Sequence, residues 1–311
     1  MDAPWALLGI WSIMRAVLRS LSLASPCLAP LCLASLCLAL AAPALAAPAR
    51  PAPPAKPVVI PLEPYLGVLW AFQGEADGKP RRFLLDTAGG ITGVSADFAK
   101  SIGCAPWGRV TGFRMRGDRI DLPRCDDVAL KAAGQPLVVP TAGVIDFATL
   151  LPKDAPPLDG SVALDAFAGH AVTLDIAHRR LIVETPASLK TRAAQRVEVP
   201  VRFSREATGL ALTPFVAVPT PKSRIWLELD CGSVGALVLA KHVAPVLGLD
   251  PETKSGQSAE LSLVGGPKFG GKVLVEDMIL DGNIGLPVLE TWVVTLDLAN
   301  ERAWIAPAGK P

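Results

Sequence analysis

The sequence has few aromatic side chains and almost no net charge, and both shortages exclude classes of ligand. Phe, Trp and Tyr make up 5% of the 311 residues, with a single Tyr, which argues against a stacking platform for single-stranded nucleic acid. The 30 basic and 29 acidic side chains cannot produce the broad positive field that non-specific nucleic-acid binding needs. Half of the residues are apolar, which is enough to bury a sizeable core. We therefore expect a globular protein that does not bind nucleic acid.

Histidine and cysteine are also scarce, and their spacing predicts no metal site. The three His form no HxxxH or HxxE arrangement, so we expect neither a metal nor a cofactor. Of six Cys, three precede residue 47, and the rest are Cys104, Cys125 and Cys231. Three cysteines cannot form a disulfide framework, and their spacing fits no zinc site. A Cys104–Cys125 disulfide, formed in an oxidising compartment, is left open.

The N-terminal region lacks charge over a long stretch, which is typical of an export signal. No charged residue lies between Arg19 and Arg50, where Leu and Ala dominate. The tripeptide Ala-Leu-Ala that ends at residue 46 has the small-x-small pattern of a cleavage site, so residues 1–46 are predicted to be a signal peptide. The alternative is a retained membrane span, although its prolines disfavour a long helix. After cleavage we expect a periplasmic or secreted protein with no stable membrane span.

Proline-rich sequence follows the predicted signal and leads into short apolar runs. Residues 47–62 are rich in Pro and Ala and are predicted to be an extended linker. Beyond them, short apolar runs are separated by Gly, Pro, Asp and Lys, with few long helical patterns. We therefore predict an all-β protein with an N-terminal lobe at 63–188 and a C-terminal lobe at 189–308.

Sequence landmarks recur in the same order in the two predicted lobes. In each lobe a pair of apolar runs ends at an Asp that is followed by small residues, at Asp86 and at Asp230. Further matches are DGSVAL at 159–164 with DGNIGL at 281–286, and VTLD at 172–175 with VTLD at 294–297. Landmarks that match in the same order indicate a duplicated unit. We expect the two lobes to be related by a pseudo-twofold axis.

The symmetry gives chemical meaning to the two aspartates that end the apolar runs. If the lobes pack about a pseudo-twofold axis, Asp86 and Asp230 face each other across a cleft. Two carboxyls that close cannot both ionise, so one pKa rises and the pair shares a proton. The ionised partner can take a proton from water while the protonated one hydrogen-bonds a substrate carbonyl. Such a pair can hydrolyse a peptide bond without a covalent intermediate, a metal or a cofactor.

The two Asp-containing turns resemble those of a known enzyme family. Their sequences are Asp86-Thr87-Ala88-Gly89 and Asp230-Cys231-Gly232-Ser233. Both are similar to the Asp-Thr-Gly-[Ser/Ala] turns of aspartic proteases, and Ile284-Gly285 resembles the element that supports such a turn. The pattern resembles the exported, retropepsin-like bacterial aspartyl proteases, here with both lobes in one chain as in pepsin. The resemblance implies two retropepsin-like β-barrel lobes and a monomeric aspartic-type endopeptidase that acts on polypeptide substrates, with Asp86 and Asp230 as its catalytic residues.

Several turn residues depart from the family's pattern. Ala88 stands where the family has Gly, and Ala163 stands where the second lobe has Gly285. Each added Cβ lies where backbone usually approaches closely. Cys231 replaces the Thr whose hydroxyl, in the family, bonds across to the opposite lobe. Because a thiol is a weaker donor, we expect this brace to loosen.

The residue three positions after each Asp also differs between the lobes. In the family a Ser or Thr at this position often bonds the outer oxygen of the Asp. Ser233 can do this for Asp230, whereas Gly89 cannot do it for Asp86. We therefore expect Asp230 to be the more acidic partner and Asp86 to hold the shared proton.

A flap that closes over the ligand is expected between the first Asp and its Asp-Gly. Residues 111–122 are the best candidate, with Arg116, Gly117 and Asp118 at the predicted tip. The arginines of this segment would favour acidic or carboxyl-bearing substrates. The alternative is a solvated charged loop.

Two other functions compete with hydrolysis. The altered turns could leave a catalytically impaired protease-like fold that binds a peptide or an envelope protein without cutting it. A third possibility is a structural envelope protein in which the two carboxylates are vestigial. Retention of both aspartates at duplicated positions favours hydrolysis, whereas the alanines and Cys231 favour the alternatives. The sequence therefore predicts an aspartic-type peptidase, with the binding module as its main alternative.

Overall fold

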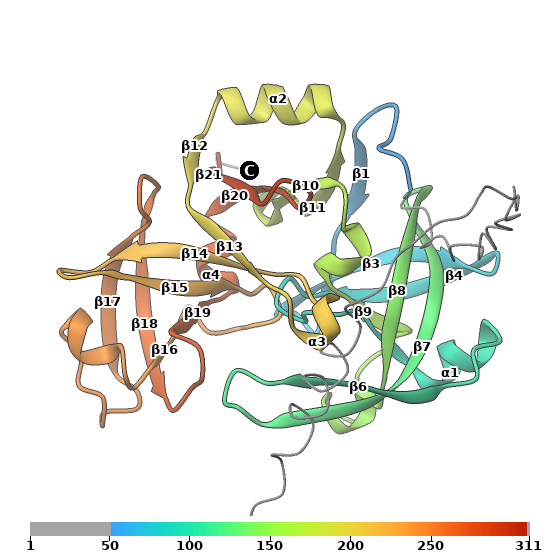
Figure 1. Cartoon of the computed structure of the whole chain (residues 1–311), viewed down its shortest axis with the longest axis horizontal. Coiled ribbons are helices and arrows are strands. Elements are labelled where there is room, and N and C mark those ends of the chain that lie inside the picture. The colour runs from blue at the N-terminus through green and yellow to red at the C-terminus, as the bar shows by residue number, and fades with distance from the viewer. Residues whose placement is uncertain (1–50, 310–311) are drawn as a thin grey trace, which may run out of the picture. The chain divides into compact units, whose positions relative to one another are not determined.

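Strands dominate the computed structural model, which describes residues 51–309 (Figure 1). The predicted signal peptide at 1–46 lies outside the described residues. Within residues 51–309 the strands form three sheets, one in each lobe and one shared by both. The helices are short: Ala96–Ser101 (α1), Pro186–Ala194 (α2), Glu206–Gly209 (α3) and Leu286–Leu289 (α4). No helix in this part of the chain is long and apolar enough to cross a membrane.

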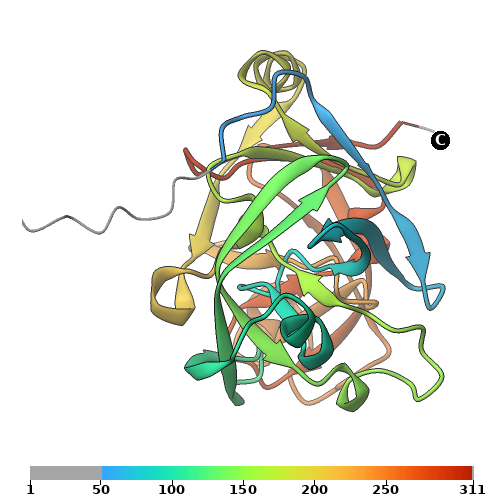
Figure 2. The same cartoon turned by 90° about the vertical axis from the view of Figure 1, so that its right-hand side faces the viewer.

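The first lobe is built on an eight-stranded sheet with the order β2-β3-β4-β9-β5-β8-β7-β6. Its strands are Glu63–Tyr65 (β2), Leu69–Ala76 (β3), Lys79–Leu85 (β4), Gly93–Ser95 (β5), Trp107–Phe113 (β6), Arg119–Ala132 (β7), Gln135–Ile145 (β8) and Gly160–Val162 (β9). Asp77 and Gly78 join β3 to β4 with φ angles of 50° and 69°, a tight hairpin turn for which Asp-Gly is suited. The long strands β7 and β8 curve across this lobe (Figure 2).

The second lobe is built on a seven-stranded sheet with the order β13-β14-β15-β19-β16-β18-β17. Its strands are Val201–Ser204 (β13), Thr213–Pro219 (β14), Arg224–Leu229 (β15), Leu237–Ala240 (β16), Gln257–Ser262 (β17), Lys268–Glu276 (β18) and Gly282–Ile284 (β19). In both lobes the strand that precedes the candidate Asp pairs in parallel with a three-residue strand, β4 with β9 and β15 with β19. The order of seven strands of the first lobe, all except β6, is thus repeated, as the sequence landmarks predict.

The third sheet joins the lobes and has the order β1-β11-β10-β20-β21-β12. Its strands are Val58–Pro61 (β1), Ala171–Asp175 (β10), Arg180–Glu184 (β11), Val197–Val199 (β12), Trp292–Asp297 (β20) and Arg302–Pro307 (β21). At its centre β10 pairs antiparallel with β20, and Thr173 lies opposite Thr295 with 2.9 Å between the two hydroxyl oxygens. These two residues are equivalent in the repeat. Together with the two similar sheets, this pairing confirms the all-β and two-lobed parts of the prediction. The end of the predicted linker forms β1 at the edge of this sheet.

A helix cap and a disulfide add local constraints to the first lobe. Helix α2 begins with a reciprocal cap, in which Thr185 Oγ1 accepts from Ser188 N at 3.0 Å and Ser188 Oγ accepts from Thr185 N at 2.9 Å. It covers the shared sheet at the predicted lobe boundary (Figure 1). Cys104 and Cys125 form a disulfide that ties the chain after α1 to strand β7, which resolves the pairing that the sequence left open.

Candidate functional site

The candidate site lies where the last residues of two equivalent strands meet between the lobes. Strand β4 ends at Leu85 and strand β15 ends at Leu229, so Asp86 and Asp230 each begin a turn. The same backbone bond holds each turn to the short parallel strand beside it. The N–H of Asp86 donates to Val162 O at 3.1 Å, and the N–H of Asp230 donates to the O of Ile284 at 3.0 Å. The fold therefore presents the two aspartates in equivalent backbone settings.

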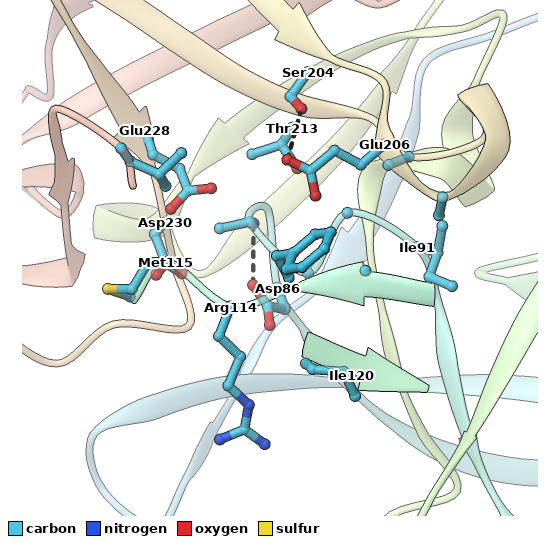
Figure 3. A pocket seen from close by; sticks show the side chains of 18 of the residues that line it. Asp86, Ile91, Arg114, Met115, Ile120, Ser204, Glu206, Thr213, Glu228 and Asp230 are labelled. Atoms are coloured by element: carbon cyan, nitrogen blue, oxygen red, sulfur yellow. Dashed lines mark hydrogen bonds between the residues drawn. The ribbon is translucent and has the colours of Figure 1, made fainter. Parts of the chain in front are cut away.

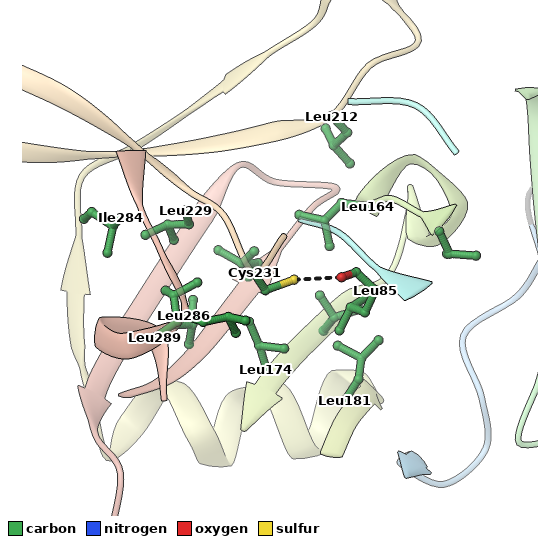
Figure 4. Packing of buried hydrophobic residues seen from close by; sticks show 14 of the residues in the cluster. Leu85, Leu164, Leu174, Leu181, Leu212, Leu229, Cys231, Ile284, Leu286 and Leu289 are labelled. Atoms are coloured by element: carbon green, nitrogen blue, oxygen red, sulfur yellow. Dashed lines mark hydrogen bonds between the residues drawn. The ribbon is translucent and has the colours of Figure 1, made fainter. Parts of the chain in front are cut away.

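Thr87 and Cys231 cross-link the two turns through buried hydrogen bonds. Thr87 Oγ1 donates to Leu229 O at 2.6 Å and accepts from Cys231 N at 3.0 Å. Cys231 Sγ reciprocates, donating to Leu85 O at 3.3 Å and accepting from Thr87 N at 3.3 Å (Figure 4). The brace is complete, and its thiol half has longer bonds because sulfur is the larger atom and the weaker donor. Burial raises the pKa of the Cys231 thiol, which keeps its proton and makes it a poor nucleophile.

The two carboxyl groups converge on the space beside Gly232. A Cβ on Gly232 would lie 3.0 Å from Oδ1 of Asp86 and 3.1 Å from Oδ1 of Asp230, so any side chain there would press on both carboxyls. Burial, together with the charge of Asp230, raises the pKa of Asp86 to about 7. Burial also raises the pKa of Asp230. The structure thus brings the two predicted residues together as an interacting pair.

Hydrogen bonds distinguish the two members of this pair. Asp86 Oδ1 accepts from Ala88 N at 3.0 Å. Asp230 accepts from Gly232 N at 2.7 Å and from Asn283 Nδ2 at 2.6 Å, and these bonds oppose the rise of its pKa. Asp230 thus has a side-chain donor that Asp86 lacks, and its assignment as the more acidic partner stays a prediction.

The residue that stabilises Asp230 is Asn283, and the sequence analysis missed it. The sequence predicts this role for Ser233, but among the described residues no hydrogen bond joins the Ser233 hydroxyl to Asp230. Ser233 Oγ instead lies 3.1 Å from the point that a Cβ of Gly285 would occupy. Asn283 could have been noticed as an amide in a buried three-residue strand, immediately before Ile284-Gly285.

Two further carboxyl groups lie near this pair, and the sequence did not predict either of them. Glu228 lies two residues before Asp230 on β15, is 6% exposed and accepts from Asn283 Nδ2 at 3.3 Å. Its pKa is raised strongly by burial and by the charge of Asp230, with smaller contributions from Asp86 and Glu206. Glu206 is exposed at the start of α3, and its carboxyl group faces that of Glu228 (Figure 3). The sequence signal that could have identified Glu228 is an acidic residue within the apolar run of β15.

The predicted flap is the hairpin formed by β6 and β7, and its turn lies against the second lobe. The turn spans 114–118 and is closed by a bond from Arg114 N to Asp118 O at 2.9 Å. Gly117 has a φ of 89°, and its Cα lies beside the side chain of Ile279. The N–H of Ile279 donates to Met115 O at 3.0 Å. The hairpin therefore bridges the two lobes above the carboxyl groups.

The arginines of this turn do not point toward the carboxyl pair. Arg116 forms an ion pair with the buried carboxylate of Glu276 on β18. Arg114 points away from Asp86 and Asp230 (Figure 3). The predicted preference for carboxyl-bearing ligands therefore loses its basis, because Arg116 is already paired and Arg114 is turned outward.

The flap, the two turns and α3 enclose a cavity of about 480 Å³. Its floor carries Asp86 and Asp230, and its walls are largely apolar: Ile91, Val110, Phe113, Met115, Ile120, Leu122, Ala211, Phe215, Ile279 and Leu280. Phe113 and Ile279 are 53% and 57% exposed, so two large apolar side chains flank the opening. A cavity with an apolar wall and a few polar groups at its floor is typical of a ligand site.

Solved structures with a similar fold include two basic 7S globulins and a protein named EDGP. The basic 7S globulin from soybean superposes with a TM-score of 0.52 at 12% identity, covering 83% of this chain and 96% of its own. Conglutin gamma, a basic 7S globulin from lupine seeds, gives 0.51 at 11% identity, with 83% and 96% covered. A protein named EDGP gives 0.51 at 11% identity, with 82% and 95% covered. The chain thus has a two-lobed, pepsin-like fold. No family model and no curated protein matches the sequence.

These comparisons correct two of the sequence-based predictions. The assignment to the retropepsin-like and pepsin-like aspartic proteases was wrong, because no model of that family matches and the structural neighbours are globulins. The assignment as an aspartic-type peptidase was wrong for the same reason. The physical cause lies in the turns themselves. Their small residues and the Thr87–Cys231 brace hold the lobes together, so the motif follows the architecture and does not by itself report hydrolysis.

Proposed function

We propose that the chain is a catalytically impaired, protease-like protein that binds an extended polypeptide segment, such as an exposed part of an envelope protein, in the cleft between its lobes. The observation that carries the proposal is the cavity of about 480 Å³ under the flap, with exposed apolar side chains at its opening. Apolar side chains exposed beside a hollow favour a partner that covers them. In this proposal each lobe is a retropepsin-like barrel, since one strand order occurs twice.

The polar floor supports binding more than hydrolysis. Water activation by a carboxyl pair needs one member ionised and one protonated. Here Glu228 adds a third buried carboxyl beside Asp86 and Asp230, and the charges of the two aspartates oppose its ionisation. Asp86 also lacks the side-chain hydrogen bond that Asn283 gives to Asp230. Hydrogen-bonding groups of this kind can still hold the backbone of a bound segment.

The proposal places the chain outside the cytoplasm and as a monomer. The Cys104–Cys125 disulfide supports an oxidising compartment, either the periplasm or the exterior. Both lobes come from one chain, so the cleft needs no second copy to be complete.

The test uses the purified full-length chain and an array of short peptides. Ile279→Asp is compared with Val246→Asp, a matched change at a residue of the same lobe that is similarly exposed but lies outside the cavity. A charge placed against an apolar ligand should weaken peptide binding about tenfold for Ile279→Asp, and Val246→Asp should bind like the wild type. Mass spectrometry should recover the bound peptides intact.

Two results would overturn the proposal. One is the absence of binding by the wild type, or equal binding by Ile279→Asp. The other is cleavage of the peptides that disappears in both Asp86→Asn and Asp230→Asn.

A further inference from the structure

The cleft is lined by more carboxyl groups than arginines, and its own arginines do not pair with the carboxyls of its floor. Asp86, Glu206, Glu228 and Asp230 all line the cavity. Among the ion pairs within residues 51–309, none involves any of these four groups. The cavity also contains Arg114 and Arg116, but Arg116 is paired with Glu276 and Arg114 points away from the floor (Figure 3). The floor is therefore acidic, although the whole chain is nearly neutral.

Glu228 is buried with only part of its carboxyl group satisfied. It is 6% exposed, and its Oε2 accepts a long bond of 3.3 Å from Asn283. Within the described residues no hydrogen bond reaches its other oxygen, Oε1. The strand register explains this, because β15 places Glu228 between Phe215 on β14 and Asn283 on β19. Neither neighbour supplies a positive charge.

The charged groups that face Glu228 come from each element packed around it. They are Asp230 on the following turn, Asp86 from the first lobe and Glu206 from α3, and all three disfavour its ionisation. Arg202 on β13, which pairs with Phe215, stacks on the ring of Trp226 with 4.3 Å to its centroid. A buried carboxyl with three acidic neighbours and one free oxygen is stabilised when a cation binds.

The spacing of these carboxyl groups favours an organic cation. Within residues 51–309, no three acidic, histidine or cysteine side chains are close enough to hold one metal ion. The groups are distributed from the floor to the start of α3, and apolar residues such as Phe215 and Ile279 line the same cavity. A ligand side chain with an apolar stem and a positively charged end could contact both the apolar walls and the carboxyl groups. Lysine and arginine have that form.

We infer that the cleft selects polypeptide segments that carry a lysine or arginine side chain, with Glu228 as the residue that receives the cation and Glu206 as its partner at the entrance. This inference rests on the proposed function, since it names the kind of segment that the cleft takes. Phe113 and Ile279 then contact the apolar side chains on either side of the basic residue.

The test compares short peptides that are identical except for a central lysine, norleucine or glutamate. At about pH 8 the lysine peptide should bind about tenfold more tightly than the norleucine peptide, and the glutamate peptide should bind least. Glu228→Gln, which keeps the shape of the side chain, should remove most of this preference. Glu206→Gln, at an exposed position where folding is not at risk, should reduce the preference by about threefold. Glu252→Gln, an exposed change outside this cavity, should have no effect.

Acidification provides a second readout of the same charge. The preference for lysine should fall as the pH is lowered from about 8, because the carboxyls that attract the cation become protonated. Binding of the norleucine peptide should change little.

The outcomes separate this inference from the proposed function. If all three peptides bind equally, or if Glu228→Gln and Glu206→Gln both keep the full preference for lysine, the inference is overturned and the peptide-binding function stands. If none of the peptides binds, the proposed function is overturned together with the inference.

Discussion

The two lobes share one strand order but surround their aspartates with different side chains. In the first lobe Leu84 precedes Asp86 by two positions and lies opposite Ser161, whereas the second lobe has Glu228 opposite Asn283 at the equivalent positions. Leu84 packs into an apolar cluster with Tyr65, Ala71 and Leu158. The duplication therefore retained the backbone, while the polar groups of the cleft became concentrated on one side. Fold and chemistry have separate determinants in this molecule.

The elements that support the two turns differ in the same way. In the first lobe Ala163 N donates to Thr92 Oγ1 at 3.2 Å, and Thr92 Oγ1 donates to the buried carboxylate of Asp165 at 2.7 Å. Burial raises the pKa of Asp165 to about 6. In the second lobe Gly285 N bonds the backbone oxygen of Ala236 at 3.1 Å. A side-chain network supports one turn and backbone contacts support the other, so equivalent substitutions should have unequal effects.

The largest difference is expected from exchanging the residues of the supporting elements. A Cβ on Gly285 would lie 2.0 Å from Gly235 O and 2.8 Å from Ser233 O. Backbone atoms cannot yield as a flexible side chain can, so Gly285→Ala should lower the free energy of unfolding by about 4 kcal/mol or more. The reciprocal change, Ala163→Gly, adds no atoms and should cost about 1 kcal/mol. Urea unfolding measures both, and similar costs would contradict the asymmetry.

A smaller difference is expected between the two halves of the brace. Thr87→Val leaves Leu229 O and Cys231 N without their partner and should cost about 2 kcal/mol. Cys231→Val removes longer bonds from a weaker donor and should cost about 1 kcal/mol. Thermal unfolding measures the two costs, and a larger cost at Cys231 would show that the thiol is the stronger half.

The sequence predicts the fold and the two aspartates of the site, but not the other polar residues around them. The matched landmarks around Asp86 and Asp230 predict the duplicated strands and the meeting of the two carboxyls, because the spacing of a repeat reports topology directly. Glu228 and Asn283 escaped notice because their significance depends on pairing between β15 and β19, which brings residues far apart in the chain side by side. The activity was predicted wrongly for a related reason. The turn motif serves the joint between the lobes, and the side chains that alter its chemistry lie on other strands.

The smallest expected effect is the difference between the two aspartates in how each makes stability depend on pH. The pKa of Asp86 in the folded protein is about 7, above the value of about 3.9 for an unfolded chain. A raised acid pKa means that the folded state binds more protons, so its contribution to stability is present below about pH 4 and is lost as the pH rises toward 7. Asp86→Asn removes the carboxyl group and with it this loss of stability at neutral pH. The variant should match the wild type at about pH 4 and unfold at a temperature a few degrees higher at about pH 7.

Asp230→Asn is the matched comparison for that experiment. Its bonds from Asn283 and Gly232 stabilise the ionised carboxylate, so the gain at neutral pH should be smaller than for Asp86→Asn. Removing Asn283 by Asn283→Leu should destabilise the protein more at neutral than at acidic pH, because the buried Asp230 would then lose a charge-assisted hydrogen bond. Scanning calorimetry from about pH 4 to pH 8 measures all three variants. Equal gains for Asp86→Asn and Asp230→Asn would mean that Asn283 does not distinguish the two carboxyls, and that the polar asymmetry between the lobes has no electrostatic consequence at the pair.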